Sequence, residues 1–108
     1  MIEDTYGLKT DDLLSAASNL ADALNCKFTH CENDARGGDY FRFDRVDGKN
    51  FFLLQKNFIA EEGLWKESEF QEWPLLLYAN YSTENEAITV REKLLSSGAA
   101  LLRSEAPS

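Results

Sequence analysis

The residues with the greatest capacity for chemistry lie between positions 26 and 39, where the chain carries Cys26, His30, Cys31, Asp34 and Asp39. A cysteine beside a histidine could form a thiolate nucleophile, and the same side chains are metal ligands. Adjacent residues of a strand point to opposite faces, however, so His30 and Cys31 would not meet. One histidine and two cysteines are also too few to complete a tetrahedral zinc site. We therefore expect a hydrogen-bonded core or interface histidine, and we predict no metal site and no cofactor.

Three further patterns have simpler structural explanations. Gly37-Gly38 precedes a strand, whereas glycines that cradle phosphates open helices. The stretch DRVDGKN, residues 44–50, resembles part of a calcium loop but lacks its closing glutamate, and a hairpin turn explains it better. Glu61-Glu62 could do acid–base work, but no neighbouring apolar sequence marks a pocket that would separate their pKa values. The sequence therefore predicts a protein that is not an enzyme.

The strongest functional signal is an acidic and aromatic segment at residues 58–73, FIAEEGLWKESEFQEW. It fits neither helical nor strand periodicity, and loops of this length inside a compact domain are usually functional or disordered. Its aromatic residues argue against disorder. Rings supply binding energy in protein interfaces and carboxylates supply steering, so we favour a partner-binding surface. The predicted partner-binding residues are Glu61, Glu62, Trp65, Glu67, Glu69, Phe70 and Glu72, with Tyr40 and Arg42 as neighbours. The alternative, in which Trp65, Phe70 and Trp73 pack in the core, stays open.

Charge narrows the class of partner. The chain of 108 residues has 11 basic and 19 acidic residues, for a net charge of −8. Binding to nucleic acids or to anionic membranes depends on basic residues, so we predict neither. A cationic protein would be attracted. With 44% apolar and 28% charged residues, the composition is that of one ordinary globular domain, residues 1–108.

Other features favour the cytoplasm. The first residues, MIEDTYGLKTDD, have no basic or apolar region typical of a secretion signal, and no apolar run is long enough to span a bilayer. The spacing of Cys26 and Cys31 places them on opposite faces of a strand, too far apart for a disulfide. We therefore expect free thiols in a reducing compartment.

Two helices and a hairpin are the clearest local elements. Thr10-Asp11-Asp12 is a typical helix start, followed by an apolar stripe that ends at Asn25. A second helix begins in the capping-box sequence of residues 83–86 and ends at Ser97-Gly98. Asp47-Gly48 predicts a tight turn between two strands. With this turn, one hairpin face carries Phe41, Phe43, Phe52 and Leu54 and should face the core, whereas the other is mixed: Tyr40, Arg42, Asp44, Phe51, Leu53 and Gln55.

The remaining elements complete an α+β prediction. The apolar run at residues 75–81, the second helix and a last strand at residues 99–103 form a βαβ unit, in which the two strands are normally parallel. The element order is α-β-β-β-loop-β-α-β. It predicts a single mixed sheet of about five strands packed against two helices. Residues 1–9 are expected to be an N-terminal arm and residues 104–108 a flexible tail.

Three phrases of the sequence carry a family resemblance: GGDYFRFD at residues 37–44, FFLLQKNF at 51–58 and EFQEWPLLLYAN at 69–80. In an acidic α/β domain of this size, they resemble small immunity proteins of bacterial polymorphic-toxin and contact-dependent growth inhibition systems. The resemblance implies a cytoplasmic protein, a monomer or weak homodimer, that binds and neutralises a cognate toxin without catalysis or a cofactor. Such toxins are often basic nucleases. Carboxylates of the immunity protein can occupy the surface with which the nuclease binds phosphates.

Two alternatives remain. A domain with an open sheet face can pair into a homodimer that holds a small regulatory ligand between its copies. A small enzyme could instead use His30 or a pair of carboxylates.

Overall fold

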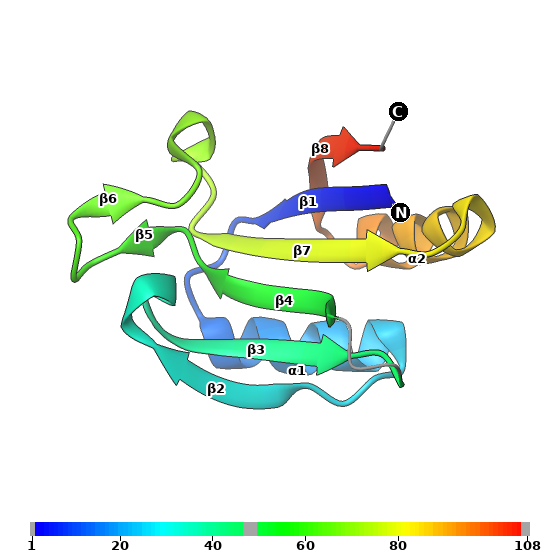
Figure 1. Ribbon diagram of the computed structural model, residues 1–108, viewed down its shortest axis with the longest axis horizontal. Helices are drawn as coiled ribbons and strands as arrows, with labels where there is room; N and C mark the ends of the chain where they lie inside the picture. The colour runs from blue at the N-terminus through cyan, green and yellow to red at the C-terminus, as the bar shows by residue number, and fades with distance from the viewer. Residues whose placement is uncertain (1, 47–49, 107–108) are drawn as a thin grey trace.

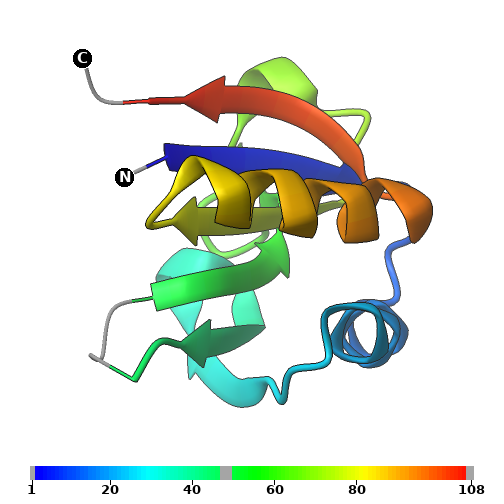
Figure 2. The same ribbon diagram turned by 90° about the vertical axis from the view of Figure 1, so that its right-hand side faces the viewer.

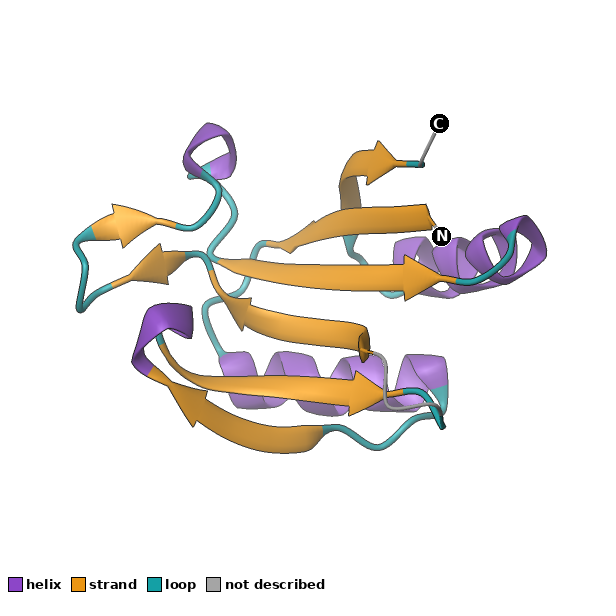
Figure 3. Cartoon of the chain, in the orientation of Figure 1, coloured by secondary structure: helices purple, strands orange, loops and turns teal. Residues whose placement is uncertain are grey.

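The computed structural model describes residues 2–46 and 50–106, which form an α+β fold (Figure 1). Two helices pack on a six-stranded antiparallel sheet, and a small two-stranded hairpin extends from it (Figure 3). The strands are β1 (Ile2–Leu8), β2 (Thr29–Asn33), β3 (Gly38–Asp44), β4 (Asn50–Lys56), β5 (Phe58–Ile59), β6 (Leu64–Trp65), β7 (Leu75–Tyr81) and β8 (Ala100–Glu105). The helices are α1 (Leu13–Leu24) and α2 (Glu84–Ser96), with single 3-10 turns η1 (Asp34–Arg36) and η2 (Ser68–Phe70). Neither helix is long and apolar enough to cross a bilayer.

The large sheet has the strand order β2-β3-β4-β7-β1-β8. Both helices cover one face of it (Figure 2), where α1 contacts β4 and α2 contacts β7 and β8. The core lies between the helices and this face, around fully buried side chains such as Leu20, Leu54, Leu77 and Leu94. We call the opposite sheet face, which carries no helix, the open face.

The predicted N-terminal arm is wrong, because residues 2–8 form strand β1, which lies between β7 and β8 in the sheet. The sequence IEDTYGL places the charged Asp4 at a position that points into the core. Asp4 is 0% exposed, and its carboxylate accepts hydrogen bonds from Arg91, which lies 87 residues away in the sequence. An acidic residue at a core-facing position, with no basic residue nearby in the sequence, interrupts the apolar alternation that identifies a strand. The sequence therefore did not predict β1.

The position of β1 also corrects the predicted sheet. Strands β7 and β8 both pair with β1 in the antiparallel sense, so they run parallel to each other with β1 between them. The predicted βαβ connection is therefore split by β1, and the described sheet is antiparallel, not mixed. The predicted tail is partly strand as well, since β8 continues to Glu105; residues 107 and 108 lie outside the described residues.

Local signals predicted the helix ends correctly. Asp12 caps α1 by accepting a hydrogen bond from the Ser15 amide at 3.1 Å, and Asn25 ends the helix in the left-handed conformation, with φ of 51°. Thr83 caps α2 through the Glu86 amide at 3.2 Å. These contacts satisfy backbone groups that a helix terminus leaves without partners.

The hairpin register is confirmed for its core face, where Phe41 pairs with Leu54 and Phe43 with Phe52. The pairing then shifts, and Asp44 lies opposite Asn50. The predicted turn at Asp47-Gly48 lies outside the described residues.

Gly7 allows Trp73 to pack directly on the open face of β1. A Cβ atom at Gly7 would lie only 2.6–2.8 Å from three atoms of the Trp73 ring. We therefore expect Gly7→Ala to lower the free energy of unfolding by about 1–3 kcal/mol, the usual cost of overpacking. Denaturant unfolding followed by tryptophan fluorescence would measure it. In a Trp73→Leu background the same substitution should lose most of its cost. An equal cost in both backgrounds would show that the ring is not the obstacle.

Candidate functional site

The acidic and aromatic segment is divided at Lys66 into two parts with different surroundings. The first part forms the β5–β6 hairpin, which projects from one end of the sheet (Figure 1). Ile59 anchors this hairpin and is 3% exposed, whereas Phe58 and Leu64 are 43% and 60% exposed. The Phe58 and Trp65 rings pack edge to face, with centroids 5.1 Å apart.

The tip of this hairpin presents two carboxylates. Gly63 has a φ of 65° and its amide donates to the Ile59 carbonyl at 2.9 Å, which closes the turn. Glu61 and Glu62 lie in the turn, are exposed, and form no ion pair with the described residues. The projecting hairpin thus combines exposed apolar side chains with unpaired negative charge.

The second part of the segment is tied to the sheet by Asn57, which is fully buried. The Asn57 side-chain nitrogen donates to the carbonyls of Phe70 at 2.9 Å and Trp73 at 3.1 Å. The Asn57 side-chain oxygen accepts from the Glu67 amide at 2.9 Å. One amide therefore holds three points of residues 67–73 against the open face.

Glu67 belongs to this internal network. Its carboxylate accepts hydrogen bonds from Arg103 at 2.9 Å and from the Tyr78 hydroxyl at 2.8 Å. Burial alone would raise the pKa of Glu67, but these hydrogen bonds outweigh burial and hold the pKa below its usual value. Burial, and then the bond to Glu67, raise the pKa of Tyr78. Glu67 is charged, and its carboxylate is already engaged by Arg103 and Tyr78 inside the protein.

Several other predicted residues are also engaged within the chain. Glu69 pairs with Arg103 at 2.9 Å, and Glu72 lies 3.6 Å from the Lys9 ammonium. Phe70 is half-buried, with the Arg103 guanidinium 5.8 Å from its ring centre. This part of the segment covers the open face of the sheet.

The two predicted neighbours lie on the open face of β3, outside the projecting hairpin. Tyr40 is buried, with the Arg36 guanidinium 5.3 Å from its ring centre. Arg42 is exposed and pairs with Asp44 at 3.3 Å. The structure therefore places Glu61, Glu62 and Trp65 on one hairpin, and Tyr40 and Arg42 on a different element.

Two hollows beside the hairpin extend this surface to other elements. One, of about 320 Å³, is lined by Phe58, Trp65 and Pro74, and the other, of about 600 Å³, by Leu14, His30 and Phe41. Asp11 and Lys56 line both hollows, which makes the surface continuous. We call this surface the acidic end; its carboxylates are Asp11, Asp12, Glu32, Asp39, Glu61 and Glu62, and its exposed apolar side chains are Leu14, Phe58 and Leu64.

Sequence reasoning missed most of the acidic end. The sequence indicates Asp11 and Asp12 only as a helix start and Asp39 only as a neighbour of His30, and nothing in it marks Glu32 as a site residue. The sequence signal that could have indicated this surface is the high density of acidic residues in the segments between secondary-structure elements. Only the sheet register, which places Glu32 opposite Asp39, brings these acids together.

His30, Glu32 and Asp39 could together hold a metal ion. Their ligand atoms lie within 4.8 Å of one another, and His30 Nε2 is 2.9 Å from Asp39 Oδ1. All three side chains are exposed. Cys31 pairs with Tyr40, at the next position of β2 after His30, so it points to the other face of the strand. The two side chains therefore do not form a Cys–His pair.

Comparison of the chain with protein-family models, with curated proteins and with solved structures found no match in any of the three. The acidic end is consequently described by its geometry and charge alone.

Proposed function

We propose that this protein is a non-enzymatic inhibitor that binds a basic protein through its acidic end, as an immunity protein binds its toxin. The observation that carries this proposal is the β5–β6 hairpin. It projects from the sheet and exposes Phe58 and Leu64 beside Glu61 and Glu62, whose carboxylates form no ion pair with any described residue. Apolar side chains and carboxylates that share one projecting element offer a partner both contact area and charge.

The distribution of ion pairs supports the same location. Glu67, Glu69 and Glu72 each form an ion pair with Arg103 or Lys9, whereas Glu61 and Glu62 form none with the described residues. The carboxylates of the acidic end outnumber its lining base, Lys56. Since the whole chain carries a charge of −8, its field would steer a basic protein towards this end at a raised association rate.

The two hollows of the acidic end supply concave apolar surface, which a protein interface needs in addition to charge. Exposed apolar side chains beside concave surface can accept anchor residues of a partner, and a polar rim excludes water around them. Leu14 is 72% exposed at the rim of the larger hollow, and Phe58 lines the smaller one. Carboxylates around these positions would pair with lysine or arginine side chains of the partner.

The experiment is co-expression of this protein with the product of the adjacent gene, followed by purification of the complex and measurement of its dissociation constant. We expect Glu61→Lys combined with Glu62→Lys to weaken binding by about tenfold or more, chiefly through the association rate and less at high salt. Leu64→Ala should cost about 2 kcal/mol if Leu64 is an anchor.

Matched control variants reverse two charges, or truncate one exposed leucine, at positions outside the acidic end. Asp22→Lys combined with Glu92→Lys reverses two exposed charges on the helices, and Leu95→Ala truncates a leucine on α2 that is 52% exposed. Both controls should bind almost as well as the unmodified protein. Equal weakening by the two charge reversals would show that net charge acts without a defined site. Absence of any complex with the neighbouring gene product would contradict the immunity assignment.

A further inference from the structure

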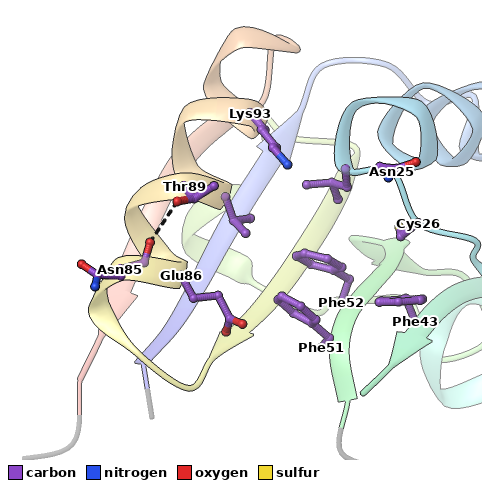
Figure 4. A pocket seen from close by; sticks show the side chains of 11 residues that line it. Asn25, Cys26, Phe43, Phe51, Phe52, Asn85, Glu86, Thr89 and Lys93 are labelled. Atoms are coloured by element: carbon purple, nitrogen blue, oxygen red, sulfur yellow. Dashed lines mark hydrogen bonds between the residues drawn. The ribbon is translucent and has the colours of Figure 1, made fainter. Parts of the chain in front are cut away.

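A separate hollow of about 420 Å³ lies on the helix-covered face of the sheet, between α1 and α2 (Figure 4). Its floor is formed by Phe43, Phe51 and Phe52, and its walls include Cys26 and Lys93. Its volume falls within the range of small-molecule sites, which are typically aromatic hollows with a few polar groups. It shares no lining residue with the hollows of the acidic end.

The floor is a set of rings in close contact. The Phe51 and Phe52 rings are stacked, with centroids 4.1 Å apart and an angle of 17° between their planes. The Phe43 ring centre lies 6.1 Å from that of Phe51. Phe52 is 2% exposed, whereas Phe43 and Phe51 keep part of their surface accessible to the hollow. Phe52 and the Arg45 guanidinium, 3.8 Å from the Phe51 ring centre, cover the two faces of Phe51, so a ligand ring would meet Phe43 and Phe51 at their ring edges.

A β-bulge places Phe51 in this position. Strict alternation puts Phe51 and Phe52 on opposite faces of β4, and the sequence predicted Phe51 on the mixed face. The pairing shifts between Phe43 and Asp44, and both Phe51 and Phe52 then line the hollow. Bulges often redirect a side chain beside a functional site.

The charges around the hollow favour an anion. Glu86 lines it, but hydrogen bonds from Arg45 neutralise this carboxylate and are the main cause that lowers its pKa. The Arg45 guanidinium also lies 3.8 Å from the centre of the Phe51 ring. Burial raises the pKa of the Cys26 thiol, which keeps it uncharged. Lys93 is exposed at the rim, and its ammonium has no ion pair with the described residues.

From this geometry we propose that the hollow binds a small planar aromatic anion. The ring of the ligand packs edge to face against Phe43 and Phe51, and its carboxylate meets the Lys93 ammonium, which extends from α2 towards the hollow (Figure 4). This site is independent of the acidic end, so a ligand and a protein partner could bind at the same time.

The test is titration of the ¹⁵N-labelled full chain with 2-naphthoate, followed by amide chemical shifts, with neutral 2-naphthamide as the matched probe. We expect saturable shifts at residues that line the hollow, including Cys26, Phe51 and Thr89. Naphthamide should bind about fivefold more weakly because it lacks the charge that meets Lys93. Lys93→Gln should remove that difference, whereas Lys66→Gln, an exposed lysine elsewhere, should preserve it.

A second pair of variants tests the aromatic contact with Phe51. Phe51→Leu should weaken naphthoate about three- to tenfold, whereas Phe58→Leu, at the acidic end, should not change it. Absence of saturable binding at millimolar probe, or shifts centred away from the hollow, would overturn the site. Equal affinity for the two probes would overturn the assignment of an anionic ligand. Because Phe51 lies outside the acidic end, Phe51→Leu should leave partner binding intact.

Discussion

Replacement of Arg91 by methionine is expected to lower the free energy of unfolding by about 3–5 kcal/mol, because it leaves a buried carboxylate without its cation. Asp4 is 0% exposed, and Arg91 donates to its two oxygens at 2.7 and 3.0 Å. The Tyr6 hydroxyl donates to the same carboxylate at 2.9 Å. Methionine preserves much of the apolar stem of arginine and removes the charge. Denaturant unfolding at pH 7 measures the loss.

The control is Arg42→Met, which breaks the exposed pair with Asp44. We expect that substitution to cost less than about 1 kcal/mol. Asp4→Asn combined with Arg91→Met removes the buried charge as well, so the double variant should recover part of the stability that Arg91→Met loses. A loss for Arg91→Met no larger than for Arg42→Met would mean that the carboxylate finds another partner.

The dependence on pH has a definite sign. Burial opposes the charged form of Asp4, but hydrogen bonds from Arg91, Ser104 and Tyr6 outweigh burial and lower its pKa. A lowered folded-state pKa gives stability that is complete above the unfolded value of about 3.9 and is lost as the pH falls through the folded value. Without Arg91, burial dominates and Asp4 takes up a proton more readily. The cost of Arg91→Met should therefore be smaller at pH 3 than at pH 7.

Asn57→Ala is expected to lower the free energy of unfolding by about 2–4 kcal/mol. It leaves the Glu67 amide and the Trp73 carbonyl without the Asn57 partner, and unsatisfied buried groups cost about 1–3 kcal/mol each. The Phe70 carbonyl loses one of two hydrogen bonds, because it also accepts from the Trp73 amide at 3.0 Å. Asn57→Asp should be no better, because an aspartate keeps the acceptor for the Glu67 amide but turns an oxygen towards two carbonyls. Thermal and denaturant unfolding measure both variants.

Hydrogen exchange separates this effect from general destabilisation. In Asn57→Ala the Glu67 amide should exchange much faster while amides of β7 stay protected, since only residues 67–73 lose their attachment. Asn33→Ala is the control, because Asn33 makes one exposed hydrogen bond to the Ala35 amide at 2.9 Å. Unchanged exchange of the Glu67 amide would contradict the role of Asn57.

The pairing of Glu67 and Glu69 with Arg103 has a functional consequence. The predicted partner-binding residues after Lys66 hold residues 67–73 against the open face of the sheet. Those before Lys66 belong to the projecting β5–β6 hairpin. Charge reversal at Glu67 would therefore damage the fold, and loss of binding by such a variant would not identify an interface. Glu61, Glu62 and Leu64 are better sites for substitution because they make few internal contacts.

Elements determined by neighbouring residues were predictable from the sequence. Asp12 and Asn25 cap the two ends of α1, and Thr83 caps the start of α2 through the Glu86 amide; each cap acts on backbone groups a few residues away. The core face of the hairpin follows from the alternation of apolar residues along β3 and β4. The α+β class followed from these elements. Strand β1 was missed because Asp4 interrupts its apolar pattern and becomes acceptable only beside Arg91.

The candidate site depended far more on contacts between distant parts of the chain. Local composition correctly marked residues 58–73 as unusual, but it could not distinguish Glu61, which stays unpaired among the described residues, from Glu67, which meets Arg103 36 residues later. The acidic end likewise joins the start of α1, the β2–β3 strands and the β5–β6 hairpin. Whether a carboxylate serves stability or binding depends on which cation the folded chain brings within about 4 Å of it, and side-chain spacing along the sequence does not contain that distance.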